Sequence, residues 1–191
     1  MKLSILILTM RERKESLKKL KKILDPQVKP RWKDVEVLIR LDGDEDNKSS
    51  VGAKRNELLA EAQGDYVCFI DDDDEVSNTY VRDILEATKT NPDCCSLRGV
   101  ITWDGEHPQI FEHSIKYKEY KTNYNDEPIK YERFPNHLNT IRRSIAIKYK
   151  FPKKNHGEDT DWATKIFNSG DIKTEATIDG IMYHYLFKSE K

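Results

Sequence analysis

The stretch that most constrains this chain runs from Tyr66 to Asp74, where an apolar segment of strand length is followed directly by four aspartates. Aromatic and β-branched residues favour a buried strand, whereas a hydrophobic core cannot hold four uncompensated carboxylates. Two unit charges 4 Å apart repel by about 4 kcal/mol at an effective dielectric constant near 20. The pattern therefore predicts a strand that ends at a partly enclosed site, where a cation balances the carboxylates.

The spacing of the four carboxylates suggests how a cation would be held. If the chain stays extended after the apolar run, Asp71 and Asp73 lie on one face and Asp72 and Asp74 on the other. One such face would offer the hard oxygen ligands that divalent metals prefer. A solvated acidic turn or an acidic helix start explains the same residues, because charge runs are usually solvated surface. The pattern of the neighbouring segments is needed to choose between a metal site and solvated surface.

The first ninety residues alternate between strand and helix patterns. Continuous apolar runs predict strands at residues 3–8, 35–41 and 65–70, and apolar residues at helical spacing predict helices at 12–24, 51–62 and 77–90. Such alternation predicts a parallel sheet with right-handed crossovers. Ligands bind outside the carboxyl ends of such strands. We therefore expect the polar ends at residues 9–11, 42–44 and 71–74 to share one crevice.

Local signals place the helix ends. Asp25-Pro26 should end the first helix, because the residue before a proline is pushed out of the helical region. Ser49 or Ser50 can cap the second helix, and Gly64 stands where a helix C-terminal glycine is expected. The lysines of the first helix are interpreted as its solvent face rather than as a binding patch.

The second half of the chain has a looser pattern. We expect a strand at 94–103, a turn at 104–108, a short strand at 109–112 and a loop with short strands at 115–134. A short strand and a helix around 143–149 follow. The acidic segment 156–161 opens a helix at 162–168 that Gly170 terminates, and strands at 172–178 and 181–186 close the chain.

Composition bounds the class of protein. The 191 residues suit one domain, and a formal net charge of −1 favours neither a nucleic-acid binder nor an acidic tail protein. Three cysteines form no disulfide framework and no metal-ligand spacing, which fits a reducing cytosol. No stretch reaches the ~18 apolar residues that a membrane span requires. We expect a soluble cytoplasmic protein that acts on any lipid-linked material only from the membrane surface.

Two further residues fit a phosphate-containing ligand. An acid cluster with a bound metal suits a diphosphate, because the metal neutralises charge that develops on a leaving group. Arg55 could pair with the same ligand through its planar fork, or could be an ordinary surface arginine. Asp42 could accept hydrogen bonds from a base or ribose, or could simply start a turn.

Four motifs together resemble family 2 glycosyltransferases with the GT-A fold. They are residues 4–11, Asp42-Gly43, residues 52–56 and residues 69–74; the resemblance covers residues 1–97 and resumes at 157–159. It implies a single α/β domain with a Rossmann-like nucleotide-sugar-binding half at 1–97, which has a mainly parallel sheet and helices on both faces. A smaller mixed half at 98–191 would bind the acceptor and supply the catalytic base.

The resemblance also implies roles for individual residues on the donor side. Thr9 and Arg11 would border the nucleotide base, Asp42 would hydrogen-bond it and Arg55 would reach the base or phosphates. The Asp-x-Asp metal motif falls on residues 71–73, with Asp71 and Asp72 near the donor and with Asp73 and Asp71 as ligands of Mn²⁺ or Mg²⁺. The extra aspartates leave this register ambiguous by one residue. His184 occupies a region where some GT-A enzymes have a histidine metal ligand, although a histidine among tyrosines in a strand is more often a packed residue.

On the acceptor side, Glu158-Asp159 matches the acidic pair that supplies the base in inverting members, and we select Asp159. Acids at a helix start also cap amides and favour the helix dipole, so a structural role competes. Trp103, His137 and Asn139 are candidates for contact with the acceptor or the sugar, because sugars stack on aromatic faces and need directional polar partners.

The resemblance implies an inverting, metal-dependent transfer of one hexosyl or deoxyhexosyl group. The donor would be a UDP-, GDP- or dTDP-linked sugar and the acceptor a glycan or glycoprotein, in surface polysaccharide or glycoprotein glycan synthesis of a bacterium or a large DNA virus. A nucleotidyltransferase remains an alternative, although residues 9–13 contain none of the glycines of its usual phosphate loop. A non-catalytic metal- or glycan-binding module is the other alternative.

Overall fold

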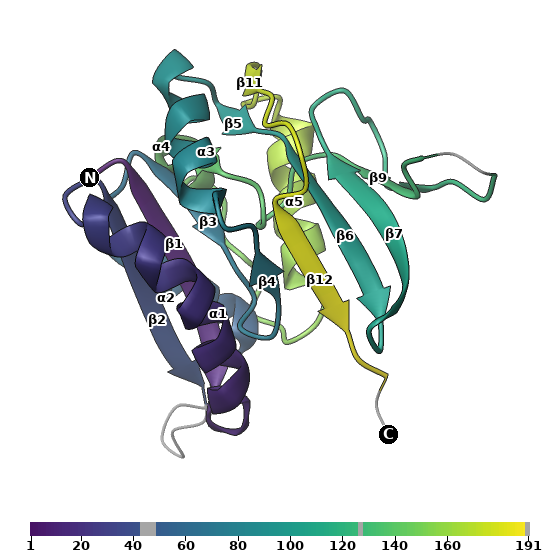
Figure 1. The fold of residues 1–191 in the computed structure, drawn as a ribbon. Coiled ribbons are helices and arrows are strands. Elements are labelled where there is room, and N and C mark those ends of the chain that lie inside the picture. Colours follow the sequence, from purple (N-terminus) through teal and green to yellow (C-terminus); the bar gives the residue numbers. More distant parts are fainter. Residues whose placement is uncertain (43–48, 126–127, 190–191) are drawn as a thin grey trace.

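Two six-stranded sheets form the framework of the molecule (Figure 1). The computed structural model describes residues 1–42, 49–125 and 128–189. The strand order is β11-β5-β10-β3-β1-β2 in the first sheet and β4-β12-β6-β7-β9-β8 in the second. The predicted polar strand end at 42–44 lies outside the described residues, apart from the strand position of Asp42.

The three predicted amino-terminal strands are confirmed. β1 (Leu3–Met10) lies between β2 (Val35–Asp42) and β3 (Tyr66–Phe69), and both pairings are parallel. The carboxyl ends of β1 and β3 therefore meet at the same edge of the sheet, where Thr9 Oγ1 donates to Asp72 Oδ2 over 2.6 Å. This contact brings together two of the three polar clusters that the alternation predicted.

Three short strands from later in the chain extend this sheet. They are β5 (Cys94–Cys95), β10 (Ile141–Arg142) and β11 (Glu175–Ala176). β10 runs antiparallel to both β3 and β5, so the first sheet is mixed. The second sheet contains β4 (Glu75–Val76), β6 (Leu97–Trp103), β7 (Glu106–His113), β8 (Lys121–Thr122), β9 (Tyr131–Arg133) and β12 (Tyr183–Phe187).

The expected single strand at 94–103 is wrong, because β5 and β6 belong to different sheets. Ser96 stands at the break. Its N–H donates to the Ala176 carbonyl over 2.9 Å, and its hydroxyl accepts from the Ile178 N–H over 3.0 Å. A continuous apolar pattern cannot reveal this change of sheet, because the residues on both sides of the break are buried.

Five α-helices and three short 3-10 segments complete the described part of the chain. The helices are α1 (Lys14–Val28), α2 (Val51–Glu61), α3 (Tyr80–Ala87), α4 (Arg143–Ala146) and α5 (Glu158–Ser169); the 3-10 segments are η1 (Arg11–Arg13), η2 (Lys29–Arg31) and η3 (Thr88–Thr90). Ser50 caps α2, because its hydroxyl accepts from the Ala53 N–H. Gly170 ends α5 in the left-handed conformation, as predicted.

Two of the predicted helix ends are wrong. α1 continues past Pro26, and Gln27 stabilises this last turn: its amide donates to the carbonyls of Ile23 and Ser77 and accepts from the Val81 N–H. Gly64 is not a left-handed helix end. A Cβ there would lie 2.6 Å from the Ser4 backbone nitrogen, so Gly64 is needed for its close approach to β1.

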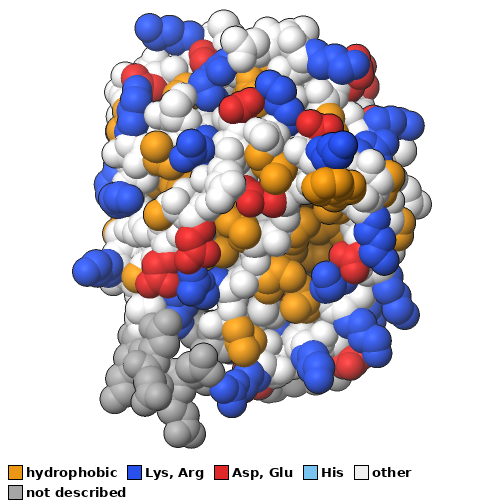
Figure 2. Space-filling model, turned by 90° about the vertical axis from the view of Figure 1, so that its left-hand side faces the viewer, with side chains coloured by type: hydrophobic (Ala, Val, Ile, Leu, Met, Phe, Trp, Pro, Cys, Tyr) orange, Lys and Arg blue, Asp and Glu red, His pale blue; other side chains and the backbone are white. Residues whose placement is uncertain are grey.

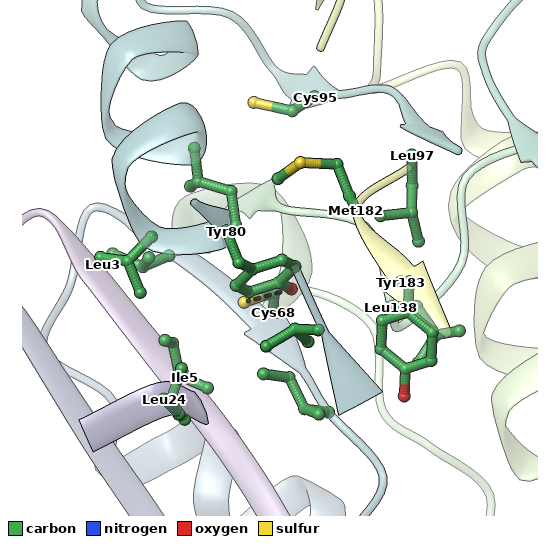
Figure 3. Packing of buried hydrophobic residues seen from close by; sticks show 14 of the residues in the cluster. Leu3, Ile5, Leu24, Cys68, Tyr80, Cys95, Leu97, Leu138, Met182 and Tyr183 are labelled. Atoms are coloured by element: carbon green, nitrogen blue, oxygen red, sulfur yellow. Dashed lines mark hydrogen bonds between the residues drawn. The ribbon is translucent and has the colours of Figure 1, made fainter. Parts of the chain in front are cut away.

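Alternate residues of β1 pack into two cores on opposite faces of the first sheet. Leu3 and Ile5 pack with α1 and α3, whereas Leu6 packs with α2 and α5. Figure 3 shows the first core, in which the Tyr80 ring reaches the Cys68 thiol between the two sheets. Strand β1, which is buried on both faces, therefore fixes where the polar strand ends emerge.

We predict that Gly52→Ala destabilises the protein. Replacing a glycine inside a helix by alanine normally raises the free energy of unfolding by about 1 kcal/mol. Here its Cβ would lie 1.9 Å from the Pro152 carbonyl oxygen, so the loop before α5 must move. Urea denaturation should show a loss on the order of 1–3 kcal/mol. A gain in stability would show that this loop moves away at little cost.

Candidate functional site

The four aspartates form a tight turn rather than an extended strand. The Asp74 N–H donates to the Asp71 carbonyl over 3.1 Å. The side chains still alternate in exposure. Those of Asp71 and Asp73 are 27% and 29% exposed, whereas that of Asp72 is 2% exposed and Asp74 is buried. Asp71 and Asp73 are therefore the two carboxylates of the turn that can meet a ligand.

The two buried aspartates are held by other protein groups. Asp72 accepts from Thr9 Oγ1 and from Arg13. Asp74 accepts from the Tyr183 hydroxyl over 2.8 Å and from the Leu186 N–H over 2.8 Å. Burial, together with the nearby Asp71 charge, raises the pKa of Asp74 to about 8. These two residues anchor the turn to β1 and β12.

Arg55, on α2, joins the turn to the start of α5. Its guanidinium donates to Asp71 Oδ1 over 3.0 Å and to Glu158 Oε1 over 3.1 Å, and its Cζ lies 5.1 Å from the centre of the Phe69 ring. Burial alone would raise the pKa of Asp71, but Arg55 and His137 outweigh burial and hold this pKa well below its usual range. Asp71 is therefore ionised at neutral pH.

Arg13 provides a second cation at the same turn. It lies 3.0 Å from Asp72 Oδ1 and 3.1 Å from Asp73 Oδ2. Burial and the adjacent carboxylates Asp72 and Asp71 nevertheless raise the pKa of Asp73, against the effect of Arg13. A carboxyl group whose ionised form is disfavoured in this way would be stabilised by a further cation.

His137 lies between Asp71 and Asp159. Its side chain is only 5% exposed, with Nε2 3.6 Å from Asp71 Oδ2 and Nδ1 3.5 Å from Asp159 Oδ2. Neither ring nitrogen makes a hydrogen bond to a described residue. Asp159, in the first turn of α5, thus faces His137, and the N-cap residue Gly157 has no side chain that could cap the helix. Asp159 is thus not the N-cap residue of α5, while its place in the first turn still fits a favourable interaction with the helix dipole.

Two cavities meet at this group of residues. The first, about 620 Å³, contains Asp159 and His137 and has aromatic walls that include Trp103, Tyr131 and Tyr185. The second, about 900 Å³, is lined by Arg13, Lys54 and all four aspartates. Arg55, Asp71 and Glu158 line both cavities. The arrangement can hold two ligands side by side, with ionisable groups at their junction.

Several predicted site residues lie away from these cavities. Thr9 is buried behind Asp72 and reaches a ligand only through it. Arg11 is exposed on η1, while Arg13 lines the cavity in its stead. Asp42 ends β2, but its side chain lies outside the described part of the chain.

The structure also does not bring Asn139 or His184 to either cavity. Asn139 is buried, and its amide is used by His113 Nδ1, the Asn136 N–H and the Cys95 carbonyl. His184 alternates with Tyr183 and Tyr185 along β12, and Tyr185 faces the cavities, so His184 points to the opposite face of the strand.

Sequence reasoning missed two residues that hold the acidic turn, Arg13 and Tyr183. Arg13 follows the expected strand end by only a few residues, and the choice between it and Arg11 depends on the conformation of η1. For Tyr183, the alternation of a strand was the available signal, because it groups Tyr183 with Tyr185 and separates both from His184.

A divalent metal fits the donor set of this turn only with help from a ligand. In residues 1–42, 49–125 and 128–189, no three His, Cys, Asp or Glu side chains converge on a metal position. Asp71 and Asp73 supply two hard carboxylate ligands. Magnesium-like ions are commonly bound by one or two carboxylates together with substrate phosphates and water. The residues therefore fit a metal that arrives with a diphosphate.

Comparison with known proteins supports the resemblance seen in the sequence. The model of the family described as glycosyl transferase family 2 matches residues 44–150. This region contains the acidic turn, Arg55 and His137, whereas Thr9 and Asp159 lie outside it. None of the curated proteins compared matches the chain.

Solved structures of S. aureus TarS share the fold. TarS 1-349 superimposes with a TM-score of 0.69 at 18% identity, covering 97% of this chain and 60% of that protein. Its complexes with UDP-GlcNAc and with UDP give TM-scores of 0.69 and 0.67 at 15% and 16% identity, covering 100% and 97% of this chain. The chain thus spans 60% of the length of each of these relatives.

We predict that Tyr183→Phe destabilises the protein by about 2–4 kcal/mol. The substitution removes a donor to the buried Asp74 and the acceptor of the Asp71 N–H, which lies 3.1 Å from the Tyr183 oxygen. The loss should increase as the pH rises through about 8, because the missing donor stabilises ionised Asp74 more than the protonated acid.

Urea denaturation at pH 6 and pH 9 measures this effect. Tyr185→Phe is the matched control, because it makes the same change on the same strand at a residue that is only half-buried. Equal stability losses in the two variants would mean that the Tyr183 hydroxyl does not hold the turn.

Proposed function

Because the chain belongs to glycosyl transferase family 2 and has the GT-A fold, we propose that it transfers one sugar from a nucleotide-diphosphate sugar to an acceptor hydroxyl. The observation that carries this proposal is the junction of the two cavities. Asp72, Asp73 and Asp74 line only the second cavity, Asp159 lines only the first, and Asp71 lines both. A donor in the second cavity would thus meet an acceptor in the first beside a carboxylate.

The second cavity suits the donor. Arg13 and Lys54 line it beside the acidic turn, so cations and carboxylates together face a bound diphosphate. The TarS structures contain UDP-GlcNAc and UDP, which makes uridine nucleotides the first to test. Arg55 would keep Asp71 ionised and oriented. In this proposal Thr9 acts through Asp72 instead of touching the nucleotide base.

Asp73 and Asp71 are the residues that would hold Mn²⁺ or Mg²⁺. When bound, the metal would neutralise the diphosphate as it leaves the sugar. Asp73 is the stronger choice, because its carboxylate is partly exposed and its negative charge is disfavoured by burial and by its neighbours. Asp71 contributes from the border between the cavities. This assignment selects Asp71-Asp72-Asp73 as the register of the metal motif.

Asp159 is the proposed catalytic base. Its carboxylate would take the proton of the acceptor hydroxyl as that oxygen attacks the anomeric carbon, while the bond to the diphosphate breaks on the opposite face. This single displacement inverts the anomeric configuration. A hydrogen bond from His137 Nδ1, now 3.5 Å from Asp159 Oδ2, would fix the orientation of the base. Glu158 is the weaker candidate, because its side chain is only 6% exposed and its Oε1 accepts from Arg55, whereas the Asp159 side chain is 31% exposed.

The first cavity suits a carbohydrate acceptor. The Trp103 and Tyr131 rings lie 6.2 Å apart on its wall, and Tyr185 adds a third aromatic face. Aromatic faces pack against the apolar side of a sugar, and polar groups fix its hydroxyls. We propose a glycan acceptor, in surface polysaccharide or glycoprotein glycan synthesis. The buried, unpaired thiols of Cys68, Cys94 and Cys95 agree with a cytoplasmic setting.

We predict that Asp159→Asn lowers kcat at least about a hundredfold and leaves the affinity for the nucleotide nearly unchanged. The amide cannot take the hydroxyl proton, and general-base catalysis contributes about 10²–10⁴ in rate. Asp161→Asn is the matched control, because Asp161 lies in the same helical turn, is exposed and pairs with Lys154. Unchanged turnover in Asp159→Asn would reject this residue as the base.

The donor site is tested by thermal shift with nucleotide diphosphates and nucleotide sugars, each with and without Mn²⁺. A ligand that binds only the folded chain raises Tm. We expect UDP and Mn²⁺ together to raise Tm more than the sum of their separate effects, because no three metal-ligating side chains converge in the described part of the chain and the diphosphate would supply the missing ligands. A shift for no nucleotide would count against a transferase of this class.

We further predict that Asp73→Ala weakens Mn²⁺-assisted binding of UDP at least about tenfold, because the metal loses its more exposed carboxylate. Asp179→Ala, which removes an exposed carboxylate far along the chain, is the control. Titration calorimetry measures both variants. Equal affinities in Asp73→Ala and the parent protein would assign the metal to other residues.

A further inference from the structure

Positive charge is concentrated in one short segment of this chain. Residues 11–33 contain ten lysines and arginines against three aspartates and glutamates, a net charge of +7, although the whole chain carries −1. This segment comprises η1, α1, η2 and the turn before β2. The near-neutral net charge therefore hides a strong separation of charge between this segment and the rest of the molecule.

The cations of α1 and its C-terminal extension are available to a partner. Lys19, Lys22 and Lys29 are exposed and form no ion pair with any residue that the structure describes, and Lys18 makes only a 3.7 Å contact with Glu15. A solvated lysine face needs no further explanation by itself. The surface next to these lysines, however, also exposes hydrophobic side chains.

Hydrophobic side chains are exposed beside this basic helix. Trp32 is 67% exposed, Ile39 40% and Leu41 43%. Ile39 and Leu41 lie on β2, the edge strand of the first sheet. Because α1 packs mainly against β1, β4 and α3, it leaves these two side chains of β2 uncovered. In Figure 2 hydrophobic side chains gather in the middle of this side of the molecule, and Lys and Arg side chains lie around its rim, including a row along the right-hand margin. We call Trp32, Ile39, Leu41 and the lysines of α1 the basic–apolar face.

We propose that the basic–apolar face docks on the surface of an anionic lipid membrane. A lipid interface is both negatively charged and apolar, so it matches the lysines and the hydrophobic residues at once. Tryptophan is enriched at membrane interfaces, where its ring is partly buried and its N–H stays wet. The described residues include no helix that is long and apolar enough to span a bilayer, so this contact is peripheral.

Other partners match only half of this surface. A nucleic acid would pair with the lysines but would leave Ile39 and Leu41 without a role. A second copy docked through the same face would cover the hydrophobic residues but would bring two lysine-rich helices together, which like-charge repulsion disfavours. The lipid surface is the one occupant that satisfies both observations.

Membrane docking would also orient the donor cavity. Arg13, which lines that cavity, directly precedes α1, so the cavity lies next to the N-terminal end of the basic helix. The proposal does not depend on the activity assigned above, because vesicle binding needs no sugar donor.

Vesicle cosedimentation tests the proposal with the full chain. Vesicles of phosphatidylcholine and phosphatidylglycerol should bind the protein at low salt and release it at high salt, whereas phosphatidylcholine alone should not bind. Each lysine near an anionic surface is worth about 1 kcal/mol, or about fivefold in affinity. The triple variant Lys19→Gln, Lys22→Gln, Lys29→Gln should therefore bind more than tenfold more weakly.

Two further variants complete the test. Trp32→Ser should weaken binding while leaving the salt dependence unchanged, because it removes apolar contact but no charge. Lys150→Gln, Lys153→Gln, Lys173→Gln is the matched control, since these exposed lysines lie outside residues 11–33 and the change in net charge is the same. Unchanged melting temperatures verify that the variants fold.

Three results would overturn the proposal. They are equal binding to both vesicle types, equal losses in the test and control triples, and self-association in sedimentation velocity that Trp32→Ser abolishes. The last result would assign the face to a second copy of the chain. Tight binding of heparin or RNA without any binding of vesicles would likewise reject a lipid partner.

Discussion

The site depends on the ion pairs that the buried Arg55 guanidinium makes. Arg55 joins three segments that are far apart in the chain: its own helix α2, the acidic turn through Asp71, and the start of α5 through Glu158. A buried ion pair pays a desolvation cost, and removal of one partner typically destabilises a protein by about 3–5 kcal/mol. The buried Arg55 cation thus holds the proposed donor and acceptor sides at one fixed separation.

The acidic turn divides its four similar side chains between two tasks. Asp72 and Asp74 are buried and held by Thr9, Arg13 and Tyr183, so they fix the turn. Asp71 and Asp73 keep partly exposed carboxylates for a ligand. Mutual repulsion within such a run would otherwise open the turn. The surrounding donors reduce this repulsion, and the pKa of Asp73, which burial and its neighbours raise, shows that part of it remains. This division explains why four acids occur where the proposed cation site uses two.

The distribution of charge over this molecule says more about its partners than the net charge does. The net charge argued against polyanionic partners, yet the cations of residues 11–33 gather beside exposed hydrophobic residues. The interpretation of these lysines as an ordinary solvent face used helical periodicity alone. Periodicity identifies the buried side of α1, but it cannot show that the neighbouring edge strand leaves Ile39 and Leu41 uncovered.

The sequence by itself determined β1, β2, β3, a serine cap of α2 at Ser49 or Ser50 and an acidic site after β3, because local propensity, apolar runs and capping are properties of neighbouring residues. It also identified Arg55 and Asp159 as candidates. Only the tertiary structure decided that α1 continues through Pro26, that residues 94–103 divide between two sheets, and that His137 lies between Asp71 and Asp159. These features depend on contacts between distant segments, whose energies exceed the local preferences that a sequence pattern records.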